Sequence, residues 1–434
     1  MVTALSATRS DVRPGRRRLG ALLPLSSGSG EISALDGLRA IAALSVMLFH
    51  SYHLVSHHVD VAGQDITFLW NYGQSGVHLF FVLSGFLLFM PFARAMLNGR
   101  PLPSVKRFFQ RRALRILPAY YVCLLILSAL HFNRYASPKG LATIGVHLFM
   151  LHDDVASMNR AINGPFWTLA IEAQFYVVLP IFAWAISRFV GATRSRWRVV
   201  IGVLAVAVGA LALRAVDEVV QVHFEPIPGV AGAAAKLFVH ATLGAQGKYL
   251  EVFALGMLCS VLYLAAQEES RQLRRRLPWI GAALVSVALV TTVGLAHLQT
   301  RMDILTPPIF TPRPLVITYP TDLLVICGPF LAGLSYASLM LGVLWAPRWL
   351  RAIFELGPLR FIGLISYSLY LWHLPILGFA THFALALPAD FRVGFEVLVG
   401  FVVAIPVAYL SYQFVERPFL AQRRRIASIA TQAA

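Results

Sequence analysis

Long apolar runs, separated from one another by polar segments, recur along this 434-residue chain. Each run approaches the ~20 residues that an α-helix needs to cross the hydrocarbon core of a bilayer. The predicted spans are residues 35–54, 74–97, 113–132, 166–190, 198–215, 247–266, 279–298, 321–345, 361–386 and 393–416. The pattern therefore predicts an all-α, polytopic membrane protein of about ten transmembrane helices.

The basic residues between the spans test this count. Clusters of arginine and lysine follow every even-numbered span, whereas segment 55–73 has no arginine or lysine and segment 387–392 has one. Cytoplasmic loops are enriched in these residues, so the alternation predicts that both termini are cytoplasmic. A missed or an extra span would break the alternation.

Composition narrows the class of protein further. At 58% hydrophobic and 13% charged residues, the chain is too apolar for a soluble protein of this length. The net charge of +17 lies in short clusters between spans, which is typical of membrane topology and argues against nucleic acid as a partner. The three cysteines fall within apolar runs and predict neither a disulfide nor a metal site.

The spans group into one domain. Residues 35–418 are predicted to form the transmembrane domain, with a short basic cytoplasmic tail over residues 419–434. Residues 1–34 are arginine-rich and then rich in serine and glycine, which favours a disordered basic cytoplasmic tail. The apolar stretch GALLPL within that tail is too short for the core of a signal peptide.

Two ionisable residues lie within the first span. Arg39 and His50 are eleven positions apart, which is about three helical turns, so both side chains point the same way about 16 Å apart along the axis. Ionisable groups are costly in hydrocarbon and are usually functional there. The predicted direction of the span places Arg39 near the cytoplasmic face and His50 in the outer half.

Two other spans bring ionisable residues to the depth of His50. The fourth span places Glu172 in the outer half, and the ninth brings His373 to a similar depth. A histidine beside a carboxylate is an orientable general base, so His50, Glu172 and His373 are the predicted catalytic residues. The alternative is that each makes one interhelical hydrogen bond that serves only packing.

A group of arginines lies at the predicted cytoplasmic mouth of the third span. Arg112 and Arg115 share one helical face, and Arg111 is close by. Guanidinium groups suit phosphate, so these three residues and Arg39, together called the arginine cluster, are predicted to bind a phosphate-bearing ligand. Positive-inside anchoring would explain residues 111–115 without a ligand, but it does not require Arg39 within a span.

Several segments, taken in order, resemble motifs of the membrane-bound acyltransferase-3 family. They are Arg39 with His50, FFVLSGF (80–86), the RxxR of Arg112 and Arg115, WTLAIEAQFY (167–176), SYSLYLWHLP (366–375) and ERPF (416–419). Each motif is weak alone, but the ordered set is specific and extends over about residues 35–418. One departure is Ala173, where an additional acidic residue is common, so Glu172 is left as the single carboxylate.

The resemblance implies a multi-pass protein of the bacterial plasma membrane that transfers an acyl group, often acetyl, from cytoplasmic acyl-CoA. The implied acceptor is a hydroxyl of a sugar, an envelope glycan, a glycolipid or a macrolide. The histidine of the first span is held essential in the family, and the RxxR arginines serve the donor. No permanently bound cofactor and no metal are implied. Some relatives carry an extracellular esterase domain, which leads us to expect either complete transfer by this chain or a separate envelope-biosynthesis partner.

Two mechanisms and one rival class stay open at this point. His50 acts as a general base oriented by Glu172 or His373, or it carries the acyl group itself as an acyl-imidazole. The rival is a secondary transporter or a lipid or glycan flippase that uses buried histidine and glutamate for proton coupling. Transporters often show repeated halves with matching broken helices, and the sequence shows no such repeat.

Overall fold

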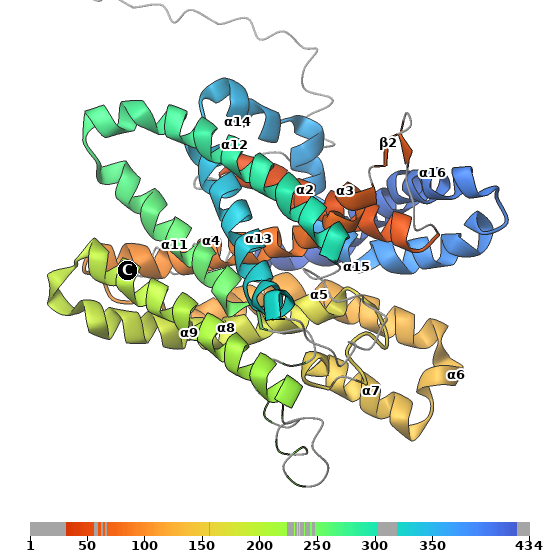
Figure 1. The fold of residues 1–434 in the computed structure, drawn as a ribbon. Coiled ribbons are helices and arrows are strands. Elements are labelled where there is room, and N and C mark those ends of the chain that lie inside the picture. Colours follow the sequence, from red (N-terminus) through yellow and green to blue (C-terminus); the bar gives the residue numbers. More distant parts are fainter. Residues whose placement is uncertain are drawn as a thin grey trace, which may run out of the picture.

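The computed structural model describes residues 32–422, apart from 56–59, 62–63, 66, 156, most of 224–247 and 303–318. Within this part the chain has ten helical spans long and apolar enough to cross a membrane, as predicted. The architecture is all-α (Figure 1), and the one extended pairing among these residues joins two-residue strands, β1 (Asp60–Val61) and β2 (Gln64–Asp65). The predicted tails, 1–34 and 419–434, lie largely outside the described residues.

The spanning helices follow one another along the chain. They are α2 (Ser33–His53); α3 (Thr67–Tyr72), η2 (Gly73–Ser75) and α4 (Gly76–Leu97) as one run; α5 (Val105–Leu130); α8 (Phe166–Val190) with η4 (Gly191–Thr193); α9 (Arg196–His223); α11 (Leu250–Glu268); α12 (Arg271–Met302); α13 (Tyr319–Trp345); α15 (Gly357–Ala384); and a last run of α16 (Ala389–Val399), η5 (Gly400–Ala404), α17 (Ile405–Ser411) and η6 (Tyr412–Glu416). The short helices between them are α6 (Phe132–Tyr135), α7 (Pro138–Leu148), η3 (His152–Asp154) and α14 (Arg348–Phe354).

Two closely packed helix pairs form the centre of the bundle: α11 lies along α4, and α15 lies along α2. A Cβ atom at Gly85 of α4 would collide with the carbonyl oxygen of Phe253, and one at Gly256 would collide with α4 in return. A Cβ at Gly363 of α15 would collide with the backbone of Asp36 on α2. Small residues let helix backbones approach where lipid supplies no hydrophobic driving force, so these glycines set the distances between the site-bearing helices.

Helix α5 begins at Val105, eight residues before the predicted start of the third span. The side-chain oxygen of Ser104 accepts a hydrogen bond from the backbone N–H of Arg107, so Ser104 caps the helix. The prediction placed residues 106–112 in a polar connection, whereas they form the first turns of the same helix. The arginines at positions 111, 112 and 115 are therefore held on one rigid element that continues into the bundle.

The connection between α5 and α8 folds back into the bundle. The hydroxyl of Tyr120 on α5 donates to the carbonyl oxygen of His147 at 2.8 Å. The side-chain amide of Asn163 donates to the carbonyl oxygen of Leu371 on α15 at 2.9 Å. Segment 143–151, predicted to be too short to span, forms the end of the eleven-residue helix α7 and the turn after it. This connection thus reaches within two residues of His373.

Candidate active site

His50 and His373 lie in contact across the packed pair α2 and α15. Nε2 of His373 is 3.2 Å from Nδ1 of His50, and the ring centroids are 5.1 Å apart. Nδ1 of His373 is 3.0 Å from the carbonyl oxygen of Leu369, and Nδ1 of His50 is 2.9 Å from that of Val46. The structure therefore brings together two of the three predicted catalytic residues.

These contacts decide which ring nitrogens carry hydrogen when both rings are neutral. A carbonyl oxygen only accepts, so Nδ1 of His373 donates to Leu369, and its Nε2 is left with a lone pair. Nδ1 of His50 then carries hydrogen and is shared between the Val46 carbonyl and Nε2 of His373. The lone pair of His50 is consequently on Nε2, which has no hydrogen-bond partner among the residues that the structure describes. An oriented lone pair is what a general base or an acyl carrier requires.

A hydrogen bond between two hydroxyl groups links α15 to α8 next to His373. The ring of Tyr370 lies 5.7 Å from that of His373, and its hydroxyl accepts a hydrogen bond from Thr168 at 2.8 Å. Both Tyr370 and Thr168 are buried. Sequence reasoning missed these two residues, although both lie within the segments that carry the family resemblance.

Glu172 lies apart from the histidine pair. Its Oε1 accepts a hydrogen bond from the hydroxyl of Ser84 on α4 at 2.6 Å, and the guanidinium of Arg112 is an electrostatic neighbour. Within the described part of the chain, Glu172 makes no hydrogen bond with His50. Of the two orienting groups that the sequence left open, the geometry therefore favours His373. Glu172 instead faces the arginine cluster.

Arg112 and Arg115 occupy different environments on the same face of α5. Among the residues that the structure describes, the buried Nε of Arg112 has no hydrogen-bond partner, which is costly for a charged donor. Arg115 is an electrostatic neighbour of Glu416, whose carboxylate accepts a hydrogen bond from Ser368 of α15. Ser368 and Glu416 thus connect the arginine-bearing helix to α15. A bound anion would satisfy the unused donor of Arg112.

The other two predicted members of the arginine cluster have neighbours of their own. Arg39 forms an ion pair with Asp36 at 2.7 Å, and each side chain is about a quarter exposed. Arg111 is partly buried and has Arg107 and Arg112 as charged neighbours. Like charges held together without enough carboxylates favour the binding of an anion.

Helix α15 relates the arginine cluster to the histidine pair. Gly363 of α15 packs against the backbone of Asp36, the residue that pairs with Arg39. Ser368 donates a hydrogen bond to Glu416, which is an electrostatic neighbour of Arg115. His373 contacts His50. These three α15 positions are five residues apart, or about 7.5 Å of rise each. The cationic half of the site and the imidazoles are therefore separated by up to about 15 Å along one helix.

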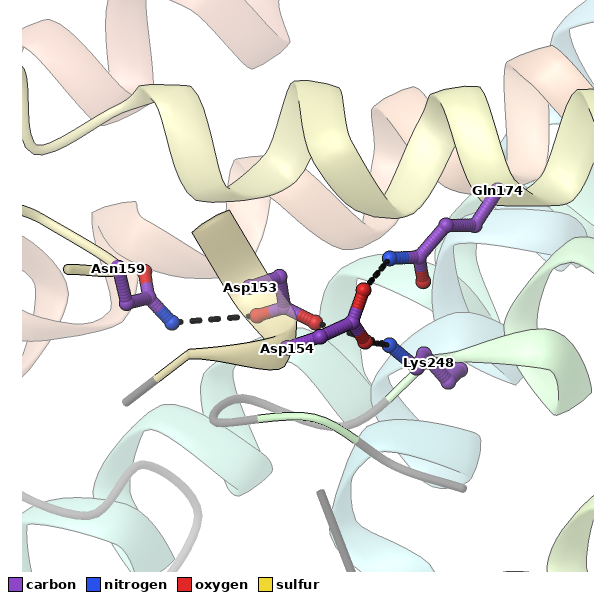
Figure 2. Close-up of polar contacts among 5 residues, drawn as sticks. All are labelled: Asp153, Asp154, Asn159, Gln174 and Lys248. Atoms are coloured by element: carbon purple, nitrogen blue, oxygen red, sulfur yellow. Dashed lines mark hydrogen bonds and ion pairs between the residues drawn. The ribbon is translucent and has the colours of Figure 1, made fainter. Parts of the chain in front are cut away.

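A buried polar cluster, which sequence reasoning missed, lies on the folded-back connection (Figure 2). Lys248 forms ion pairs with Asp154 and, at 3.3 Å, with Asp153. The side-chain amide of Gln174 donates to Asp154 at 2.8 Å, and that of Asn159 donates to Asp153 at 3.1 Å. These five residues are called the loop cluster. Burial raises the pKa of Asp153 to about 7 despite the attraction of Lys248.

Next to the loop cluster, His147 and His152 stack with ring centroids 4.2 Å apart, and burial lowers the pKa of each to about 4. An unfolded histidine titrates near 6.5, so between these values the native state binds fewer protons than the unfolded state. The two histidines therefore add stability as pH rises through this window. Asp153, whose pKa is raised from 3.8, acts in the opposite sense up to about pH 7.

We expect His152→Phe to weaken the destabilisation that acid causes, because it removes one buried histidine and keeps an aromatic ring. Between pH 7 and pH 5 the variant should lose about 2 kcal/mol less stability than the unmodified protein. Thermal unfolding in nanodiscs at the two pH values measures the difference. The exposed His382, changed to phenylalanine, is the matched control. An equal loss of stability in all three proteins would contradict the inference that His147 and His152 are buried and neutral in the folded protein.

Comparison with known families identifies the chain. The sequence profile of an acyltransferase domain matches residues 32–413, which is most of the chain. This is a protein of the acyltransferase-3 family, as the resemblance implied.

Relatives in the family have printed names that state an acetyl transfer. A putative peptidoglycan O-acetyltransferase of Bacillus subtilis (strain 168) is 27% identical, over 90% of this chain and 55% of the relative. The peptidoglycan O-acetyltransferase OatA of Listeria monocytogenes is 24% identical, over 89% of this chain and 55% of the relative. The chain thus spans about half the length of these relatives. No solved structure matches the chain significantly.

Proposed function

We propose that the chain is an integral-membrane O-acyltransferase that uses cytoplasmic acyl-CoA, with acetyl-CoA as the first donor to test. The proposed acceptor is a hydroxyl of a cell-envelope glycan, and peptidoglycan is the first candidate because the relatives are named for it. The observation that carries the proposal is the arrangement beside α15, where, among the described residues, the buried Nε–H of Arg112 has no partner at one level and an oriented imidazole lone pair lies at another.

The arginine cluster would bind the donor through its phosphates. Arg112 offers a buried N–H that has no partner within the described part of the chain, and Arg115 is an electrostatic neighbour of Glu416, whose carboxylate accepts a hydrogen bond from Ser368. The remaining distance to His50, up to about 15 Å along the helix axis, corresponds to about half the hydrocarbon core. The extended pantetheine arm of CoA suits a passage of that length, with its thioester at the histidines.

His50 would act on the acceptor hydroxyl through Nε2. As the hydroxyl oxygen attacks the thioester carbonyl, Nε2 takes its proton, the C–O bond forms, and the C–S bond breaks. The CoA thiolate then receives the proton from the imidazolium, so the base is regenerated. In the alternative mechanism, Nε2 itself attacks the carbonyl, the C–S bond breaks and CoA leaves as the thiolate. The acceptor hydroxyl then attacks the acyl-imidazole, the N–C bond breaks, and the hydroxyl proton passes to the thiolate.

His373 is proposed as the positioning residue that orients His50. His373→Ala should lower kcat by less than the roughly 10²–10⁴-fold expected for loss of the base itself, with both KM values unchanged. His373→Gln should restore part of the activity, because its amide oxygen can accept from Nδ1 of His50. The pH profile of kcat should shift in His373→Ala. An unshifted profile with a raised KM would assign His373 to packing alone.

Release of free CoA thiol tests the proposed function. Purified protein in nanodiscs, given acetyl-CoA, should release thiol faster when a peptidoglycan or envelope-glycan extract is added. A panel of longer acyl-CoAs determines the chain length that the site accepts. Absence of release from every donor, together with absence of CoA binding, would contradict the proposal and favour the transporter.

A further inference from the structure

The loop cluster takes no part in the mechanism above, yet it lies close to the histidine pair. Arg160, on the same folded-back connection, is an electrostatic neighbour of both Asp153 and His50. Asn163 of this connection contacts α15 two residues before His373. One side chain, that of Arg160, therefore lies between the cluster and the base.

Among the residues that the structure describes, three buried amide oxygens in this region have no hydrogen-bond partner. They are Oδ1 of Asn159, Oε1 of Gln174 and Oδ1 of Asn163. Asn159 and Asn163 are only 3% and 4% exposed, and the amide nitrogens of all three residues are hydrogen-bonded. Buried polar atoms are nearly always paired, so three unmet acceptors together indicate a ligand that brings hydrogen-bond donors.

The charge of the cluster limits what that ligand is. Two acidic side chains lie against Lys248, and Arg160 is an electrostatic neighbour of Asp153, so the cluster has no strong excess of positive charge that would attract the phosphates of a nucleotide or a lipid headgroup. Carboxylate and amide oxygens together accept hydrogen bonds from hydroxyl groups. Trp167 adds an aromatic surface next to Arg160, whose guanidinium carbon lies 5.8 Å from the ring centroid.

We propose that the loop cluster is the acceptor subsite and binds an uncharged pyranose ring through its hydroxyls, so that one hydroxyl reaches Nε2 of His50. The inference rests on the proposed function and extends it to the substrate class and the residues that select it. The subsite also explains how the two substrates are kept apart. Cationic groups bind the phosphates of the donor at one level of α15, and acidic and amide groups bind the sugar at the other.

The test measures glycan binding in the absence of donor, so it does not depend on transfer. The probe is a soluble, uncharged oligomer of β-1,4-linked N-acetylglucosamine, titrated onto the full chain in nanodiscs. Asp154→Asn keeps the shape of the side chain and an acceptor for Gln174 but removes the charge facing Lys248. We expect the Kd of the glycan to rise by roughly 10-fold or more, with the Kd of acetyl-CoA unchanged.

A second variant separates a ligand contact from a structural role. Gln174→Met is close in size and removes, without a change in charge, both the unpaired oxygen and the amide donor to Asp154. If the oxygen binds the sugar, the glycan Kd rises, whereas a structural role alone lowers the melting temperature and leaves the glycan Kd unchanged. Glu269→Gln, which removes the carboxylate of the exposed ion pair with Arg196, is the matched control and should bind the glycan normally.

The outcomes are distinct for the two proposals. Unmeasurable glycan binding by the unmodified protein, or unchanged glycan affinity in both Asp154→Asn and Gln174→Met, would overturn the acceptor subsite. Normal glycan binding that depends on the loop cluster, with no acyl transfer, would instead contradict the proposed function and leave the subsite standing.

Discussion

His50→Ala is expected to abolish acyl transfer and to leave acetyl-CoA binding intact. The substitution removes the lone pair on Nε2, which the contacts with Val46 and His373 orient. The arginine cluster is on α2 and α5, at the level of Gly363 and Ser368 of α15, and is not changed by the substitution. Loss of a general base typically lowers the rate by roughly 10²–10⁴-fold, and loss of an acyl carrier would leave only background hydrolysis. CoA release and donor affinity, measured on the same nanodisc preparation, separate chemistry from binding.

The control for this experiment is His382→Ala, which removes an exposed histidine from the same helix as His373. It should transfer acyl groups at the unmodified rate. If His50→Ala lost donor affinity as severely as turnover, His50 would belong to the donor site, and its assignment to chemistry would be wrong.

Arg112→Ala is expected to raise the KM and the Kd for acetyl-CoA by roughly 10- to 10²-fold, because a charge-assisted contact with phosphate is lost. Arg112→Lys should restore little, since an ammonium group lacks the planar fork that meets two phosphate oxygens. The KM for the glycan should not change. Isothermal titration with CoA and steady-state kinetics with acetyl-CoA measure the two quantities.

Arg107→Ala is the matched control for Arg112, because it removes an exposed arginine from the same helix. It should have little effect on donor affinity. Equal losses of donor affinity in the two variants would mean that the arginines of this helix serve only to orient it in the membrane. The donor site would then have to lie elsewhere.

The sequence predicted the spans and the depth of several residues well, because both depend on length alone. Apolar runs of bilayer length recur as helices, and a rise of about 1.5 Å per residue places His50 and His373 at the same level. The depth of a residue in the membrane does not determine which neighbouring helix its side chain faces, however. Glu172 is predicted to lie with the histidines, yet it accepts a hydrogen bond from Ser84 and has Arg112 as an electrostatic neighbour, both on other helices.

The loop cluster could not be predicted, because its members are distant along the chain. Asp153 and Asp154 follow a short helix and have the composition of a solvated loop, while Lys248 lies 94 positions beyond Asp154. Only the return of the connection into the bundle, through contacts such as Asn163 with Leu371, buries them. Tertiary contacts of this kind leave no periodic signal in a single sequence.

The most direct test of acyl transfer follows the acyl group itself. Acetyl-CoA labelled with a heavy isotope in the acetyl group is incubated with protein in nanodiscs and peptidoglycan fragments, and the glycan is analysed by mass spectrometry. The labelled acetyl group should appear as an alkali-labile ester on the glycan with the unmodified protein and be absent with His50→Ala. Label that stays in CoA or in free acetate with the unmodified protein, across the tested envelope glycans, would contradict the assignment of O-acyl transfer to this chain.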